Sequence, residues 1–412
     1  MVALQDNNFK ACRVIALAVI SLMALEFAER PVRQCARTDP PISKLLHNKA
    51  FVGIYQLPLA VGPRMFDWCP LWTRGSDGNR TIHWAKFMSR DILMAIKPAI
   101  MKTIVIAIGG NSLIKDDQHM SVPDQYAAVV ETARHITDLI ERGFRVVITH
   151  GNGPQVGFIL LRSEHSRGLL HEVPLDSIGA DTQGAIGYQI QQAMENEFHR
   201  RSLKKSVATI VTQTLVDKND PAFQKPSKPI GQFYKKQEAD DRMRVEKWSM
   251  VEDAGRGWRR VVPSPKPTRI IEADVIRHLV NDGYVVIAAG GGGIPVVQDE
   301  QGNLRGTAAV IDKDLASAVL AKEIAADLLV ISTAVEKVCL NFGKPDQKTL
   351  DGMTVAEAKQ FIAEGHFKPG SMLPKVQACV QFIENGGQEA LITCPEALPA
   401  ALAGKTGTRV VP

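Results

Sequence analysis

The sequence predicts a three-layer αβα sandwich with a mainly parallel central sheet and a small inserted lid subdomain. From Met101 onward, short apolar runs rich in β-branched residues alternate with segments that have the apolar spacing of amphipathic helices. This alternation is typical of layered α/β folds. Three of the runs, residues 103–108, 145–149 and 284–289, end in glycine-rich turns. Buried strands of parallel sheets have this composition, so we expect all three in the central sheet.

The remaining elements follow in chain order from the same patterns. Ser121 can cap a helix that has Pro123 and Asp124 in its first turn and continues to Gly143. Helical spacing predicts further helices over residues 154–167, 180–201, 272–282, 314–324, 354–364 and 373–384. Apolar runs predict further strands over residues 207–212, 328–332 and 390–393.

One stretch, residues 217–268, breaks this alternation. It is crowded with Pro, Lys and Arg, and the sequence from Asp253 to Gly257 predicts a hairpin turn within it. We interpret the stretch as a subdomain that is inserted into the fold and acts as a lid.

The first hundred residues differ from the rest of the chain. Between residues 31 and 98 they show no sustained period of a helix or a strand. The apolar run at 14–25 is shorter than the roughly 20 residues of a membrane span, so we expect no membrane segment. A signal-peptide core is the alternative, but no clean small-x-small cleavage site follows it. We expect residues 1–100 to be an extension without a fold of its own, or upstream translation before a native start at Met101.

Charge and cysteine content argue against two classes of function. Residues 1–100 hold 13 of the 49 Lys/Arg and 7 of the 44 Asp/Glu, so the basic excess of the chain lies entirely in them. The α/β body therefore lacks the charge excess of a nucleic-acid-binding domain. The six cysteines show no metal-like spacing and are too sparse for a disulfide framework. We expect a cytoplasmic protein that holds no metal through its own side chains.

The three glycine turns predict a phosphate site. They are Gly109-Gly110-Asn111-Ser112, Gly151-Asn152-Gly153-Pro154 and Gly290-Gly291-Gly292-Gly293. Without a Cβ atom nearby, backbone N–H groups can approach an anion, and a following helix adds its positive N-terminal end. One such turn is equally compatible with an ordinary tight turn. Three in one chain favour anion binding.

Six sequence blocks stand out along the chain: GGN at 109–111, HGNGPQVG at 150–157, PSKPIG at 226–231, GGGGIP at 290–295, AVIDKD at 309–314 and GSMLPK at 370–375. These blocks resemble those of the carbamate kinases, which belong to the amino-acid kinase superfamily. They occur in order, and the resemblance extends from about Lys102 to the C-terminus. Residues 1–100 have no counterpart in it. Ser112 departs mildly from the family, in which alanine is common at this position.

The resemblance implies a reversible reaction in which ATP and carbamate give ADP and carbamoyl phosphate. It also implies Mg²⁺ bound mainly through the ATP phosphates, and a homodimer. The family pattern divides the chain into a carbamate-binding lobe at 101–283, which includes the lid, and a nucleotide-binding lobe at 284–412. The metabolic role implied is ATP formation in arginine or purine catabolism.

The resemblance also implies which residues bind the substrates. Gly109, Gly110 and Asn111 would hold the transferring phosphoryl group. Gly151, Asn152 and Gly153 would hold carbamate, and Gly291 and Gly292 would lie near the reacting groups. Ala334 and Val335 would belong to the adenine pocket, for which an apolar packing surface is the alternative.

Four charged residues are candidates for catalysis: Lys228, Lys313, Asp314 and Lys375. Phosphoryl transfer requires positioning and neutralisation of charge more than covalent help, and lysines supply both. Lys313 lies at a predicted helix start, where the macrodipole disfavours a cation unless an anion is bound there. We assign Lys313 and Lys375 to the ATP phosphates and Asp314 to orienting the lysines. Lys228 is favoured over Lys225 because it lies in the family motif.

Alternative interpretations explain less of the sequence. His150 could be a general base, but the attacking oxygen of carbamate has no proton to lose, so a structural role is favoured. A dinucleotide-binding oxidoreductase would need GxGxxG, which the turn at Gly151 does not supply. A catalytically silent binding protein would be expected to lack one of the four charged residues. Kinases of acetylglutamate or glutamate share the fold, but the blocks at 150–157 and 226–231 favour carbamate.

Overall fold

The computed structural model describes residues 71–74, 80–83, 101–110, 113–114, 118–253 and 256–412. The chain divides into two compact units, Met1–Ile100 and Met101–Pro412. In the first unit, β1 (Leu71–Arg74) and β2 (Arg80–His83) form an antiparallel pair that the sequence did not predict. The apolar run at 14–25 lies outside the described residues. Within the described part of the chain, no helix is long and apolar enough to cross a membrane.

The second unit is built on an eight-stranded sheet. In spatial order its strands are β17 (Gly352–Thr354), β19 (Thr408–Val411), β18 (Ala390–Thr393), β14 (Leu328–Ser332), β3 (Thr103–Ile108), β4 (Arg145–His150), β11 (Val285–Ile287) and β5 (Val207–Thr209). Neighbouring strands are parallel, except that β19 runs antiparallel to β18. All residues of β3, β14 and β18 are buried, as expected for strands covered on both faces.

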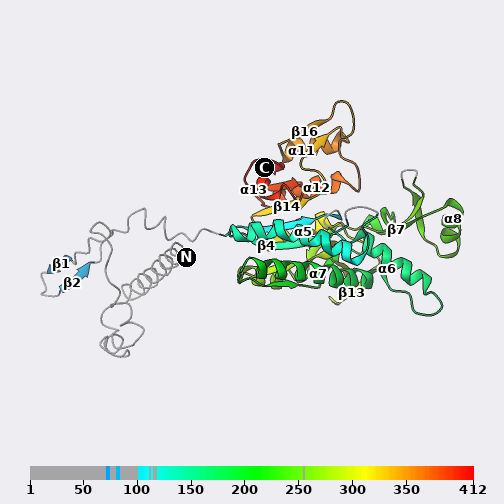
Figure 1. The fold of residues 1–412 in the computed structure, drawn as a ribbon, viewed down its shortest axis with the longest axis horizontal. Coiled ribbons are helices and arrows are strands. Elements are labelled where there is room, and N and C mark those ends of the chain that lie inside the picture. Colours follow the sequence, from blue (N-terminus) through cyan, green and yellow to red (C-terminus); the bar gives the residue numbers. More distant parts are fainter. Residues whose placement is uncertain (1–70, 75–79, 84–100, 111–112, 115–117, 254–255) are drawn as a thin grey trace. The chain divides into compact units, whose positions relative to one another are not determined.

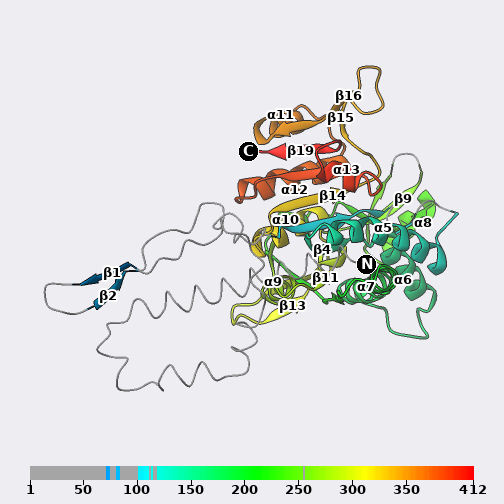
Figure 2. The same ribbon diagram turned by 60° about the vertical axis from the view of Figure 1, so that its left-hand side comes forward.

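Helices cover both faces of this sheet (Figure 1, Figure 2). One layer comprises α5 (Val122–Glu141), α7 (Leu175–Arg200) and α13 (Leu398–Leu402), and the other comprises α9 (Ala273–Asn281), α10 (Lys313–Glu323), α11 (Val355–Ala363) and α12 (Met372–Glu384). In β3, Ile104 and Ile106 pack in the cluster of the first layer, whereas Val105 and Ala107 pack in that of the second. Successive strand side chains point to opposite faces, so one apolar run supplies both cores. The predicted three-layer sandwich is confirmed.

Most predicted boundaries agree within a few residues, and the differences have local causes. Ser121 caps α5 as predicted, in a capping box with Asp124. Helix α7 begins at Leu175, five residues before the predicted start at 180. Leu175 and Ile178 are buried in one cluster, so packing holds the first turn despite Gly179. Strand β11 ends at Ile287, two residues early, because Ala289 adopts a left-handed φ of 49°.

A second, four-stranded sheet lies in the same unit and carries the lid. Its strand order is β10 (Pro267–Ile270), β6 (Gln213–Val216), β12 (Ile294–Gln298) and β13 (Leu304–Gly306). The insertion leaves after β6 and returns at β10, and these two strands pair with each other. The contacts join residues 101–412 into one unit, and the division into two lobes at residue 284 stays a prediction.

The lid itself contains a small sheet and one helix. Strand β7 (Lys228–Tyr234) pairs with β9 (Trp258–Val262), β9 pairs with β8 (Ser249–Glu252), and α8 (Lys236–Val245) lies between β7 and β8 in the chain. Glu252 pairs with Trp258, so the hairpin predicted around residues 253–257 is confirmed. Strand β7 packs on α6 (Gly153–His165), as Figure 1 shows at the end of the unit that carries α8. Three smaller elements are η2 (Pro221–Phe223) and the antiparallel pair β15 (Val338–Leu340) and β16 (Lys348–Leu350).

A chain that begins at Met101 should fold by itself. Every described hydrophobic cluster is built from residues after Met101. We expect cooperative thermal unfolding, followed by circular dichroism, with a midpoint within about 4 °C of that of the full chain, since about 1 kcal/mol moves the midpoint of a domain of this size by 2–4 °C. An insoluble product or a larger drop would show that residues 1–100 stabilise the second unit.

Candidate active site

The glycine turns meet at the carboxyl edge of the central sheet. The strand registers pair Ile108 of β3 with His150 of β4, and Ile148 of β4 with Ile287 of β11. The turns that begin at Gly109, Gly151 and Gly290 therefore leave the sheet at one edge. In open α/β sheets this edge is where ligands bind.

The third turn, η3 (Gly290–Gly292), is packed tightly against its neighbours. A Cβ atom on Gly290 would lie 2.3 Å from His150 Nε2, and one on Gly291 would lie 2.1 Å from Asn152 Nδ2. Gly291 and Gly292 also have positive φ angles of 67° and 94°. The N–H of Gly292 donates to the carbonyl of Ala289 at 3.0 Å. Gly290 and Gly291 are therefore required by close packing against His150 and Asn152. This packing explains the glycines without any contact to a ligand.

The four charged candidates converge at the start of α10. Asp312 caps this helix through its Oδ1 atom, and its Oδ2 atom accepts a hydrogen bond of 2.9 Å from Lys228 Nζ of the lid. Lys313 is the first helical residue and donates to Oδ1 of Asp314. Lys375, in the first turn of α12, donates to Oδ2 of Asp314 at 2.9 Å. Two carboxylates thus hold three ammonium groups from the lid, α10 and α12.

The electrostatics of this network favour an anion. The Asp314 carboxyl is 2% exposed. Burial opposes its ionisation, but the charges of Lys313 and Lys375 outweigh burial and lower the Asp314 pKa to about 2. Burial lowers the pKa of Lys313, and the charge of Asp314 opposes that shift. Three cations against two anions leave positive charge at a helix N-terminus, which is the setting in which proteins bind phosphate.

The Gly151 turn lies beside this positive charge. A Cβ atom on Gly151 would lie 3.5 Å from Cδ of Lys313, so the lysine side chain passes directly over the turn. The buried Asn152 donates from Nδ2 to Thr182 Oγ1 of α7 at 2.9 Å. Gly153 is exposed and opens α6. The turn is therefore hydrogen-bonded to α7 through Asn152 and contacted by the Lys313 side chain at Gly151.

The other predicted residues lie at the same edge with fewer contacts. A Cβ atom on Gly109 would lie 3.0 Å from the carbonyl oxygen of Ser332, so β3 and β14 end in close contact. Gly110 is exposed. Asn111 lies outside the described residues. Ala334 and Val335 lie in the bend after β14, with Ala334 exposed and Val335 half-buried.

Comparison with known proteins places this arrangement in a family. The sequence profile of the amino acid kinase family matches residues 102–394. A carbamate kinase of Thermococcus kodakarensis is 52% identical over 314 residues, which cover 76% of this chain and 99% of the relative. The chain belongs to the carbamate kinases of the amino acid kinase family.

Further relatives agree with this assignment. The carbamate kinase-like protein YahI of Escherichia coli (strain K12) is 53% identical to this chain. The match covers 75% of this chain and 98% of YahI. The structure of carbamate kinase from Giardia lamblia bound to AMP-PNP has a TM-score of 0.72 at 43% identity, over 76% of this chain and 99% of that one. As a member of the carbamate kinases, the chain is an enzyme.

Asp312, whose carboxylate has two roles in this structure, was not identified from the sequence. Besides pairing with Lys228, the carboxylate accepts hydrogen bonds from the N–H groups of Asp314 at 3.0 Å and Leu315 at 3.4 Å. An aspartate directly before a predicted helix start is a strong N-cap signal, and this signal could have identified it. The link of Thr149 to Ser317 at 2.6 Å, which fixes α10 on β4, had no such signal.

The structure places His150 in a buried, uncharged setting. Its ring is 1% exposed, and Nδ1 donates to the carbonyl of Gly151 at 3.0 Å, which leaves Nε2 without a proton and next to Gly290. Burial, with a smaller contribution from the charge of Lys313, lowers the His150 pKa to about 4. A neutral, enclosed imidazole of this kind suits the structural role.

The stability of the protein should therefore fall in acid in a way that depends on His150. Below pH 6.5 the unfolded chain protonates this histidine, whereas the folded chain does so only near pH 4. The free energy of unfolding therefore carries no penalty from His150 above pH 6.5. It falls by about 3 kcal/mol as the pH falls from 6.5 to 4. Urea unfolding at pH 7 and pH 4 should show that the loss in stability is smaller for His150→Asn than for the wild type. Equal losses in both proteins would contradict the burial argument.

Proposed function

We propose that the enzyme transfers a phosphoryl group reversibly between ATP and carbamate, giving ADP and carbamoyl phosphate. The observation that carries the proposal is the convergence of Lys228, Lys313 and Lys375 on Asp312 and Asp314, beside the Gly151 turn. A loose phosphoryl-transfer transition state spreads negative charge over the transferring oxygens, and preorganised cations stabilise it. The structural relative bound to AMP-PNP supports a nucleoside triphosphate as one substrate.

In this proposal the residues of the cluster have separate roles. Lys313 and Lys375 contact the phosphate oxygens, and Asp314 keeps both ammonium groups in place because it binds each of them. Lys228 acts from the lid and neutralises charge when the lid is closed. The attacking oxygen of carbamate carries no proton, so the reaction needs no general base, and the neutral His150 is consistent with this chemistry.

The glycine turns complete the proposed substrate site. Gly109, Gly110 and Asn111 hold the transferring phosphoryl group, and Gly151, Asn152 and Gly153 hold carbamate. Gly291 and Gly292 lie near the reacting groups, where Gly291 packs against Asn152 of the carbamate turn and Gly292 packs against Ile311. Ala334 and Val335 line the adenine pocket at the end of β14.

The residues of the site fit a Mg²⁺ ion that arrives on the nucleotide. Among the described residues no group of three or more His, Cys, Asp or Glu side chains could hold a metal ion. Asp312 and Asp314, the carboxylates of the cluster, are both paired with lysines. Mg²⁺ in kinases is commonly held by substrate phosphates with few protein ligands, and it neutralises phosphate charge during transfer. We propose this mode of binding here.

Three wider features belong to the proposal as well. We infer that the enzyme forms ATP in arginine or purine catabolism, acts as a homodimer and works in the cytoplasm. Support comes from the family resemblance and, for the cytoplasm, from the sparse cysteines, three of which are free thiols in the described part of the chain.

Purified protein should form ATP from ADP and carbamoyl phosphate only when Mg²⁺ is present, because the lysines alone cannot neutralise the phosphate oxygens. A coupled assay of ATP formation measures this, with the phosphates of acetylglutamate and glutamate as competing substrates. Undiminished turnover in excess EDTA would exclude the proposed metal role. Faster turnover of a competitor would overturn the choice of carbamate.

Replacement of the lysines should separate their roles. Lys313→Ala and Lys375→Ala should each lower kcat at least about a hundredfold, because their charge is needed most as it spreads in the transition state. Lys228→Ala should lower kcat and the affinity for carbamoyl phosphate together. Lys225→Ala is the matched control, since Lys225 is exposed three residues earlier in the lid. Near wild-type rates for Lys313→Ala and Lys375→Ala would place the site elsewhere.

A further inference from the structure

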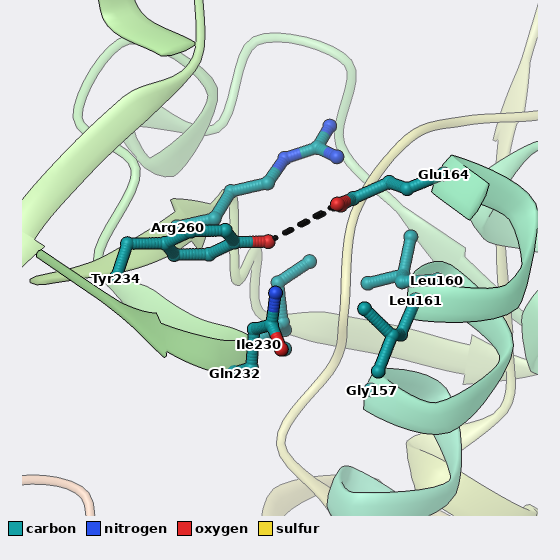
Figure 3. Close-up of a pocket in the computed structure, with 9 residues that line it drawn as sticks. Gly157, Leu160, Leu161, Glu164, Ile230, Gln232, Tyr234 and Arg260 are labelled. Carbon is teal, nitrogen blue, oxygen red and sulfur yellow. Dashed lines mark hydrogen bonds between the residues drawn. The ribbon is translucent and has the colours of Figure 1, made fainter. Parts of the chain in front are cut away.

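One face of α6 leads from the substrate turn to the lid. Gly153 opens the helix, and Gly157, Leu160 and Glu164 follow at spacings that bring them to the same side. Figure 3 shows this face opposite β7 and β9 of the lid, with Glu164 and Tyr234 pointing toward each other. Strand β7 begins with Lys228, the lid lysine of the cluster. The contacts between α6 and β7 therefore connect the substrate turn to Lys228.

The first contact joins two glycines. A Cβ atom on Gly157 would lie 3.3 Å from Cα of Gly231 and 3.7 Å from its N and C atoms. Gly231 has a φ of 71°, and the pairing of β7 with β9 shifts between Ile230 and Tyr234. Backbone thus lies against backbone at the point where β7 bends. Because no flexible side chain lies between them, an added methyl group requires the two backbones to move apart by a few tenths of an ångström.

The second contact joins two side chains further along. The buried Tyr234 donates its hydroxyl hydrogen to Glu164, at 3.3 Å from either carboxylate oxygen. Arg242 of α8 reaches the same carboxylate at 3.4 Å. Between the two contacts lies a small pocket lined in part by Leu160, Leu161 and Arg260 (Figure 3). The glycine contact and the Tyr234 contact therefore lie on either side of this pocket, and Ile230 packs on α6 between them and Lys228.

The two contacts lie at different places along both elements. Gly157 and Glu164 are seven residues apart, which is about 10 Å of helix at 1.5 Å per residue. On β7, Gly231 and Tyr234 are three residues apart, with the bend of the strand between them. The two contacts therefore fix the position of β7 along α6. Lys228 lies three residues before Gly231 on the same strand, and its ammonium group donates a hydrogen bond to Asp312 of the cluster.

Packing transmits this position to Lys228. Ile230, two residues after Lys228, is 3% exposed and lies in one cluster with Val156 of α6 and Ile178 of α7. The backbone from Lys228 to Gly231 is thus held between the glycine contact and a buried side chain. A shift at Gly231 has to move either Ile230 or the Lys228 ammonium group.

We propose that Gly157 is a positioning residue for Lys228: its lack of a side chain sets how closely β7 lies on α6, and thereby where the Lys228 ammonium group lies relative to the carbamate turn. The inference rests on the proposed role of Lys228 in the reaction. Gly157 ends the 150–157 block and Gly231 ends the 226–231 block, and in the structure these two glycines are in contact. The proposal therefore explains both glycines by one contact.

Gly157→Ala tests this, with Gly184→Ala as the matched control. Both are helical glycines, so alanine favours each helix by about 1 kcal/mol, but a Cβ atom on Gly184 would meet nothing within 4 Å. We expect Gly157→Ala to lower kcat/KM for carbamoyl phosphate about tenfold, with the KM for ADP and the melting temperature nearly unchanged. Gly184→Ala should keep wild-type kinetics. Wild-type kinetics in Gly157→Ala, or a rise in the KM for ADP as large as that for carbamoyl phosphate, would overturn the proposal.

A double variant separates positioning from general damage. In the Lys228→Ala background, Gly157→Ala should lower kcat/KM for carbamoyl phosphate by less than about twofold, because the ammonium group that Gly157 positions is already absent. A full tenfold loss in that background would overturn the positioning role. If Lys228→Ala alone is as active as the wild type, the proposed role of Lys228 fails instead. Should Gly157→Ala not fold, Tyr234→Phe, which removes the second contact, must give the same selective loss for carbamoyl phosphate.

Discussion

The carboxylate of Asp314, buried between two lysines, is the constraint on which the site depends. An isolated carboxylate in this position would cost several kcal/mol, and the ammonium groups of Lys313 and Lys375 offset that cost. The pair of lysines then carries more charge than one carboxylate balances. The fold thus stabilises the cations without neutralising them, and it leaves their surplus charge at the start of α10 for a bound anion.

The sheet could be predicted because its physical causes are local. Runs such as 103–108, 328–332 and 390–393 are apolar and contain β-branched residues, and the strands occur where these runs occur. The site was predictable to the extent that helix physics marks it, since a lysine at a helix start needs a reason. Asp312 has a local mark of the same kind, because an aspartate directly before a helix start is a favoured N-cap. Asn111 lies outside the described residues, so its placement stays a prediction.

Other features depend on contacts between distant segments and leave no local mark. The early start of α7 follows from Leu175 and Ile178 packing with lid residues such as Ile230, which lie about 50 residues further along the chain. The glycines of η3 have the composition of a phosphate loop, yet close packing against His150 and Asn152 is what requires them. A sequence pattern shows that a side chain is absent but cannot show what occupies its space.

The point at which the lid joins the body has a consequence for how the protein opens. The chain leaves the four-stranded sheet at Val216 and returns at Pro267, and these two residues are paired neighbours. Paired Cα atoms lie about 5 Å apart, so the body holds both ends of the insertion together whether or not the lid is folded. The lid can therefore open or unfold without loss of the two large cores on the faces of the central sheet, although the small cluster that Ile230 and Val262 form with α6 and α7 would be lost. Its small interior around Tyr234, Ala239 and Met250 makes it the part of the enzyme expected to open first.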